Sequence, residues 1–189
     1  MQCKYIFLLL TLAAANSAVA ENAEGLSMNT VPVQHVVYTP NISFEDFTAK
    51  FIKLCGTHNI KAYESLLNEP AQRASAVKAI GAMEGSSGFM IFATYDHGAL
   101  LNVKNEPRKA KQYVVGNPLI AARMTEHDIR AALYAPLRVL VYEDTHSKTI
   151  VEYDLPSTLF GQFHNAKVDV VAKELDEKLS QLIKKASNK

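Results

Sequence analysis

The chain has 189 residues, 48% of them hydrophobic and 21% charged, which is the composition of an ordinary globular domain and excludes a largely disordered chain. Lys and Arg number 20 against 19 Asp and Glu, so the formal net charge at pH 7 is +1. A nearly neutral protein has no general electrostatic attraction for nucleic acid, and we therefore expect no nucleic-acid partner.

The N-terminus carries the features of a secretory signal peptide. Lys4 precedes an apolar run over residues 5–15, and Ala-Val-Ala at residues 18–20 has the small-x-small pattern of a cleavage site. We predict a signal peptide over residues 1–20, cleaved before Glu21, and a periplasmic or secreted mature protein. The alternative, a membrane anchor, needs about 20 apolar residues and a stop signal. No later stretch is long or apolar enough to span a membrane.

Cleavage would leave a neutral chain with a single cysteine. Residues 1–20 hold one lysine and no acid, so Lys plus Arg falls from 20 to 19 against 19 acids. Cys55 would then have no partner for an internal disulfide. Its place beside an apolar helical stripe predicts a buried, inert thiol. The alternative is a nucleophile paired with His58, for which the sequence supplies no orienting acid.

The first elements follow a polar segment. Residues 21–32 are small and polar and predict a flexible lead to a single domain over residues 33–185. Residues 33–39 are rich in β-branched side chains and predict a strand. Ser43 and Asp46 form a capping box at the start of a helix, which ends before Gly56. The apolar stripe of this helix consists of Phe44, Phe47, Phe51 and Leu54.

The next segment is the least defined. Residues 60–66 fit either a strand or a helix, the alanine-rich residues 71–83 predict a short helix, and residues 84–88 predict a loop. The sequence does not say where the insert over residues 62–88 lies against the rest of the domain.

The second half of the chain predicts most of a sheet. Residues 89–95 are apolar on both faces, which is typical of a central strand, and residues 111–116 predict its neighbour. Residues 137–143 and 149–155 predict a hairpin. A loop through Gly161 then leads to a last helix capped by Asn165, whose apolar face consists of Val168, Val171, Ala172, Leu175, Leu179, Leu182 and Ile183.

Gly-Asn-Pro at residues 116–118 marks a corner between a strand and a helix. Asn117 is a good N-cap, and Pro118 suits the first helical position because its missing N–H costs nothing there. Short helices are predicted over residues 118–124 and 126–134. The alternative, a phosphate site, lacks the further glycines and the lysine of phosphate-binding loops.

The order of elements predicts an α+β fold, with a long C-terminal helix packed on one face of an antiparallel sheet and short helical inserts. Four segments also resemble the domain-of-unknown-function 302 family: YDHGALL (95–101), YVVGNPLIAARM (113–124), ALYAPLRVLVYED (132–144) and TIVEYDLPSTLF (149–160). The similarity covers roughly residues 89–163. It implies a compact α+β domain able to form a homodimer, and it supplies no reaction.

Asp96 and His97 are the first candidates for chemistry, because they follow a buried strand at the point where loops begin. An adjacent acid and histidine would supply an acid/base pair or metal ligands. The alternative is a turn in which Asp96 caps, His97 is exposed and Gly98 bends the chain. Since the sequence has no His-Glu-x-x-His or Cys-x-x-Cys, we predict no metal site, and the sequence names no cofactor.

Arg138 and Glu143 lie toward opposite ends of one predicted strand and on opposite faces. Arg138 would hold an anionic ligand or neutralise an acid, Glu152 or Asp154, on the neighbouring strand. Arg123 would face the same space, whereas Glu143 begins a polar hairpin loop.

Three functions fit these observations. The first is an exported, non-enzymatic domain that binds a small molecule in an apolar cleft between sheet and helix. The second is an enzyme, hydrolase-like or other, that uses His97 as acid/base with Asp96 or Glu143. The third is a dimeric structural or interaction module. The candidate ligand-binding residues are Asp96, His97, Asn117, Arg123, Arg138 and Glu143.

N-terminal sequencing of the exported protein tests the predicted maturation. We expect the sequence to begin at Glu21, because the Ala-Val-Ala site ends at Ala20. An intact Met1 or a retained membrane anchor would contradict the predicted location.

Overall fold

The computed structural model describes residues 25–188. Contacts divide the chain into residues 1–30 and residues 31–189, and the described residues of the first unit contain no helix or strand. The predicted signal peptide and its cleavage site lie outside the described residues. Within the part that is described, no helix has the length and apolar character needed to cross a membrane.

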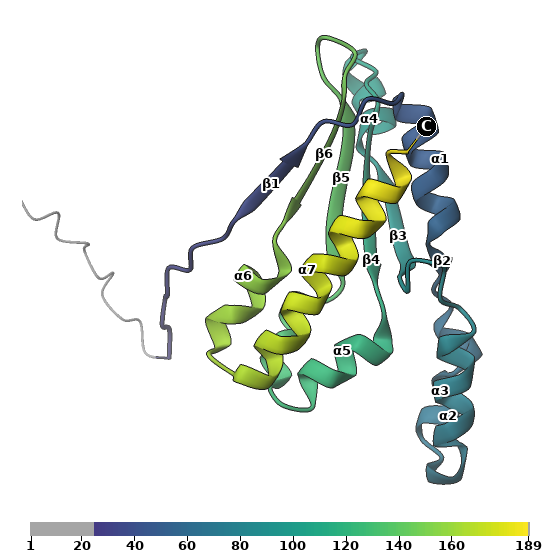
Figure 1. The fold of residues 1–189 in the computed structure, drawn as a ribbon, viewed down its shortest axis with the longest axis vertical. Helices are drawn as coiled ribbons and strands as arrows, with labels where there is room; N and C mark the ends of the chain where they lie inside the picture. The colour runs from purple at the N-terminus through teal and green to yellow at the C-terminus, as the bar shows by residue number, and fades with distance from the viewer. Residues whose placement is uncertain (1–24, 189) are drawn as a thin grey trace, which may run out of the picture. The chain divides into compact units, whose positions relative to one another are not determined.

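One sheet runs through the second unit, with its strands in the order β1-β6-β5-β4-β3-β2 (Figure 1). Neighbouring strands are antiparallel except β2 and β3, which are parallel. The strands are β1 (His35–Tyr38), β2 (Gly56–Thr57), β3 (Met90–Asp96), β4 (Ala110–Gly116), β5 (Leu137–Glu143) and β6 (Thr149–Asp154).

The helices confirm the predicted α+β class. The long C-terminal helix α7 contacts α1, α5 and α6, and α1 also contacts β5 (Figure 1). The α-helices are α1 (Phe44–Leu54), α2 (Glu64–Leu67), α3 (Arg73–Gly81), α4 (His97–Leu100), α5 (Pro118–Thr125), α6 (Pro156–Phe160) and α7 (Ala166–Ala186). Short 3-10 helices are η1 (Ile60–Ala62), η2 (Pro70–Gln72), η3 (Leu101–Lys104), η4 (Ile129–Leu133) and η5 (Gly161–Phe163).

The main core lies between one face of the sheet and helices α1 and α7. Tyr113 of β4 and Val139 of β5 are register partners, and both are fully buried. Phe47 and Phe51 of α1 and Leu179 of α7 are also fully buried in this cluster. Burial of each such side chain stabilises the fold by about 1.5–3 kcal/mol. The apolar faces predicted for the first and last helices are confirmed.

Side-chain caps fix the starts of both helices. Ser43 Oγ accepts a hydrogen bond from the Asp46 N–H of α1 at 3.1 Å and donates to Asp46 Oδ2 at 2.8 Å. Asn165 Oδ1 accepts from the Lys167 N–H of α7 at 3.1 Å. These contacts satisfy backbone donors that have no partner within the helix, and they confirm the predicted caps.

The predicted central position of the strand over residues 89–95 is wrong. The only strand beyond β3 is β2, which pairs with just Met90 and Ile91 among the described residues. The rest of β3 is therefore an edge, and Tyr95 is 53% exposed. A short apolar run does not distinguish a central strand from one that is buried only at its first residues.

Two shorter elements also differ from expectation. The predicted loop through Gly161 is helical, because Pro156 starts α6 and η5 follows it. The second helix after the Gly-Asn-Pro corner is the 3-10 helix η4, capped by Asp128, whose side chain accepts from Arg130 N. Helices this short depend on tertiary packing more than on local pattern.

The insert that the sequence left unplaced forms η1, α2, η2 and α3. It has its own small core, in which Tyr63, Ala76 and Ile80 pack with Met90 of β3. Partly buried Phe92 and Leu119 also contact this cluster. The insert therefore lies beside the first residues of β3 and the first turn of α5.

The opposite face of the sheet carries alternating polar and apolar side chains. Arg138 is exposed, Leu140 and Tyr142 are half-buried, and Val37 is 60% exposed. Antiparallel sheets commonly bury one face and leave the other in water.

A hydrogen-bonded chain of side chains joins three strands on this open face. His35 of β1 contacts Asp154 Oδ1 through Nδ1 at 2.9 Å and Glu152 Oε2 through Nε2 at 3.2 Å. Tyr142 of β5 donates from its hydroxyl to Glu152 Oε1 at 2.7 Å. The hydrogen bond to Asp154, then that to Glu152, raises the pKa of His35 above its ordinary value.

The contacts of His35 with Asp154 and Glu152 predict that the attachment of β1 to β6 depends on pH. Because the pKa of His35 is raised in the folded state, its contribution to stability is fully present below the unfolded value, about 6.5, and is lost as pH rises through the higher folded value. We expect the difference in unfolding free energy between wild type and His35→Gln to shrink across that interval. The contribution is small because the side chain is half exposed.

Urea unfolding at a series of pH values measures this difference. The control is His146→Gln in the β5–β6 turn, whose side chain is 81% exposed and lies 3.8 Å from a single acid, Asp144, so its effect on unfolding free energy should be smaller. A difference for His35→Gln that grows with pH would contradict the assignment.

Candidate functional site

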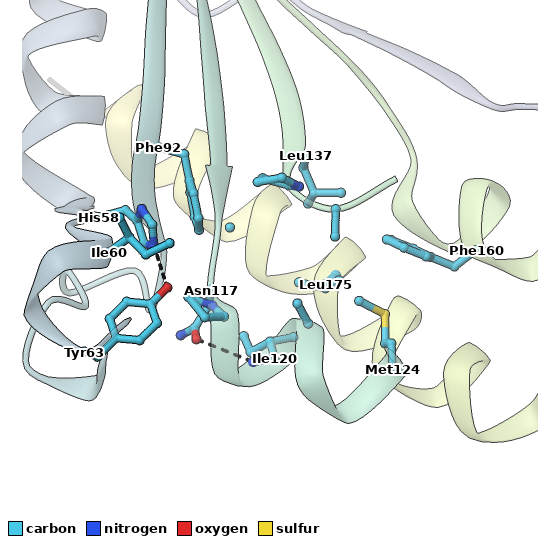
Figure 2. Close-up of a pocket in the computed structure, with 15 residues that line it drawn as sticks. His58, Ile60, Tyr63, Phe92, Asn117, Ile120, Met124, Leu137, Phe160 and Leu175 are labelled. Atoms are coloured by element: carbon cyan, nitrogen blue, oxygen red, sulfur yellow. Dashed lines mark hydrogen bonds between the residues drawn. The ribbon is translucent and has the colours of Figure 1, made fainter. Parts of the chain in front are cut away.

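A cavity of about 400 Å³ lies where the ends of β3, β4 and β5 meet α5. Figure 2 shows its lining, with α5 along one wall. Most of the lining is apolar: Phe92, Ile120, Ala121, Met124, Leu137, Phe160 and Leu175. A concave apolar site of this volume is within the usual range for small-molecule binding, about 300–1,000 Å³.

The cavity has few polar groups. Among the described residues, no Lys, Arg, Asp or Glu side chain lines it, and the polar side chains are His58, Tyr63 and Asn117. The walls therefore offer hydrogen bonds but no fixed charge.

His58 and Tyr63 form a pair at one end of the cavity. The His58 ring stacks on Phe92, with centroids 3.9 Å apart and planes 17° apart. His58 Nε2 hydrogen bonds with the Tyr63 hydroxyl at 2.8 Å (Figure 2). Burial lowers the pKa of His58 below its ordinary value, so the neutral imidazole is favoured at pH 7.

The backbone around β2 holds this pair in place. The His58 N–H donates to Ile91 O of β3 at 3.0 Å. Just before it, Gly56 lies so close to the insert that an added Cβ would meet Met83 O at 1.7 Å. The first helix was predicted to end before Gly56. A glycine is required at this position because the two backbones approach each other so closely.

Asn117 confirms its predicted role as the N-cap of α5. Its side-chain oxygen accepts from Leu119 N at 2.9 Å and Ile120 N at 3.4 Å. Its amide donates to Glu84 Oε1 at 2.7 Å and to Gly88 O at 3.0 Å, and the residue is 6% exposed. These contacts occupy both the oxygen and the nitrogen of the side-chain amide. Asn117 therefore has a structural role in the cavity wall, and the Gly-Asn-Pro segment is a corner between strand and helix.

Asp96 and His97 lie elsewhere, at the far end of β3. Asp96 Oδ1 accepts from Ala99 N at 2.8 Å and so caps α4. Both residues are exposed, and within residues 25–188 no hydrogen bond joins them. His97 instead lines a groove beside the open sheet face, together with Tyr142 and Glu143.

The remaining predicted residues are also outside the cavity. Arg123 binds Glu174 of α7 through two hydrogen bonds, at 2.8 and 3.0 Å. Glu143 contacts Lys109 Nζ at 3.0 Å. The structure thus brings His97 and Glu143 to one groove, places Asn117 in the cavity, and separates the others.

The predicted pairing of Arg138 with Glu152 or Asp154 is wrong. Within the described range Arg138 has no ion pair inside 4.0 Å, and both acids contact His35. His35 comes from β1, whose place beside β6 the sequence did not reveal.

Cys55 is buried, as predicted. Burial raises the pKa of its thiol to about 11, so the thiolate needed for nucleophilic attack is not formed at neutral pH. His58 contacts Tyr63 and Phe92 instead of the cysteine. In the described part of the chain, no group of three or more His, Cys, Asp or Glu residues is arranged to hold a metal ion.

Sequence reasoning missed Tyr63 and Phe92 as site residues and considered His58 only as a partner of Cys55. Tyr63 falls within the segment whose secondary structure was ambiguous, and Phe92 was part of an apolar run. The histidine and the tyrosine are close in sequence, but only a defined turn at η1 brings their polar atoms together.

The fold and cavity define a single-sheet α+β domain with an apolar cavity. The chain belongs to the family described as "Domain of unknown function DUF302", whose model matches residues 68–186. This confirms the resemblance seen in the sequence. His58 and Tyr63 precede the matched segment.

A solved structure has the same fold. The crystal structure of the uncharacterized conserved protein DUF302 from Bacillus stearothermophilus is 16% identical, with 80% of this chain and 97% of that chain covered and a TM-score of 0.56. No curated protein matches the chain. The homodimer, the exported location and the lack of a nucleic-acid partner stay predictions.

Replacement of Asn117 tests its structural role at the corner between β4 and α5. Asn117→Ala removes the cap, which costs about 0.5–2 kcal/mol, and removes the donor to the half-buried Gly88 carbonyl. We expect a loss of about 2 kcal/mol in unfolding free energy, measured by urea denaturation.

The matched control is Asn59→Ala, which removes the exposed cap of η1. We expect this variant to lose no more than about 1 kcal/mol of unfolding free energy. Equal losses in the two variants would contradict the role assigned to the buried amide.

Proposed function

We propose that the domain is a non-enzymatic binding protein that holds a small apolar molecule in the cavity under α5, in the periplasm or outside the cell. The observation that carries this proposal is a cavity of about 400 Å³ with an almost wholly apolar lining. The walls of an empty apolar cavity lack van der Waals contacts that a bound ligand would supply. Such a site gains binding free energy from each apolar carbon that leaves water.

The groups nearest the cavity support binding more than catalysis. His58 has the phenol of Tyr63 as its partner, and among residues 25–188 no carboxylate forms a hydrogen bond that would orient the ring as a general base. The thiol of Cys55 stays protonated. The alternative enzyme would use His97 with Glu143, but Glu143 is held by Lys109 at 3.0 Å and Asp96 by Ala99 N.

Filling the cavity tests the proposal. Ala121 lines the cavity, whereas its neighbour Ala122 is exposed on the same helix. Ala121→Phe places a ring in the ligand space and should weaken binding of the neutral fluorescent probe N-phenyl-1-naphthylamine at least about tenfold, a change of about 1.4 kcal/mol.

Ala122→Phe is the matched control and should bind the probe as wild type does. Fluorescence titration gives the affinities, and thermal unfolding verifies that both variants fold. Equal probe affinity in the two folded variants would refute binding in this cavity.

A further inference from the structure

The cavity has a polar end and an apolar end. His58, Ile60 and Tyr63 lie on one side in Figure 2, and Met124 and Phe160 lie on the other. Ile60 is 49% exposed, whereas Met124 and Phe160 are fully buried. His58 is half-buried and Tyr63 is 6% exposed, so the polar pair lies at the end of the cavity nearer to solvent, and the fully buried Met124 and Phe160 form the depth.

We propose that the ligand is an uncharged amphiphile, with an apolar body in the depth of the cavity and one hydroxyl or carbonyl oxygen that hydrogen bonds with the His58–Tyr63 pair. This inference rests on the proposed function and names the chemical class of its ligand.

The hydrogen-bonding capacity of the pair is only partly used. The bond between His58 Nε2 and the Tyr63 hydroxyl at 2.8 Å is the only side-chain hydrogen bond of either residue within the described chain. If the imidazole accepts from the phenol, its other nitrogen donates and the phenol oxygen accepts. If the imidazole donates, the phenol hydrogen and the other ring nitrogen remain. Either tautomer leaves one donor and one acceptor. A hydroxyl group of the ligand can use both, whereas a carbonyl oxygen can only accept from the donor.

Asn117 does not compete for this role. Its oxygen accepts from two backbone N–H groups of α5, and its amide donates to Glu84 and Gly88. A ligand that bonded to Asn117 would have to displace a helix cap. The polar group of the ligand is therefore directed to His58 and Tyr63.

The ligand is uncharged because none of the residues among 25–188 that line the cavity supplies a counter-ion. Arg123, on the helix α5 that forms one wall, is held by both oxygens of Glu174. Glu84, on the far side of the Asn117 amide, would oppose an anion. A buried charge without a partner is strongly unfavourable, and burial lowers the pKa of His58, which favours its neutral ring.

Displacement of N-phenyl-1-naphthylamine by four eight-carbon probes tests this class at pH 7.5. The probes are 1-octanol, octane, octanoate and octylammonium. Tyr63→Phe keeps the ring and removes only the hydroxyl, and Tyr134→Phe, whose hydroxyl contacts Gln162 outside the cavity, is the matched control. His58→Phe keeps an aromatic ring on Phe92 and removes both nitrogens.

We expect Tyr63→Phe and His58→Phe each to weaken 1-octanol about fivefold, the worth of one neutral hydrogen bond. Octane should be unchanged in both variants, and Tyr134→Phe should match wild type for every probe. This pattern would support the inference.

Three results would overturn it in distinguishable ways. Equal losses for octane and 1-octanol would show that the pair makes no specific polar contact, although binding in the cavity would stand. Tighter binding of octanoate or octylammonium than of 1-octanol would replace the uncharged class by a charged one. If wild type bound neither the fluorescent probe nor any chain, the proposed function itself would fail.

Discussion

The buried side-chain amide of Asn117 connects the parts of the molecule on which the cavity depends. Through its oxygen it starts α5, and through its nitrogen it ties β4 to the loop that carries Glu84 and Gly88. Because the amide fixes where the strand ends and the helix begins, it sets the space between α5 and the sheet. A polar group buried with all its bonds made specifies one geometry, whereas a partly bonded one would destabilise it.

The two faces of the sheet then have different roles. One face and helices α1 and α7 form the apolar core, and the cavity opens where that core ends at α5. On the other face, His35, Glu152 and Tyr142 tie β1, β6 and β5 together. The separation explains why the polar candidates read from the sequence do not form one site. Most of them form strand and helix contacts, whereas the cavity is lined mainly by apolar residues.

Much of this architecture was predictable from local pattern. Helices α1 and α7 follow from apolar spacing and caps, and Asn117 with Pro118 predicts the start of α5. The errors concern relations between distant segments. Glu152 and Asp154 were expected to pair with Arg138 but contact His35. The sequence could not reveal this, because nothing in it places β1 beside β6. The His58–Tyr63 pair escaped notice because a short irregular turn creates it. Register and strand order decide such contacts, and neither is visible in a window of neighbouring residues.

Methionine methyl NMR tests most directly whether an apolar molecule occupies the cavity. Met124 lines the cavity and is 1% exposed, whereas Met28 is 67% exposed. On addition of N-phenyl-1-naphthylamine to the wild-type protein, the Met124 methyl resonance should shift with saturation and the Met28 resonance should stay in place. A Met124 resonance that does not move at probe concentrations that saturate the fluorescence signal would contradict the account.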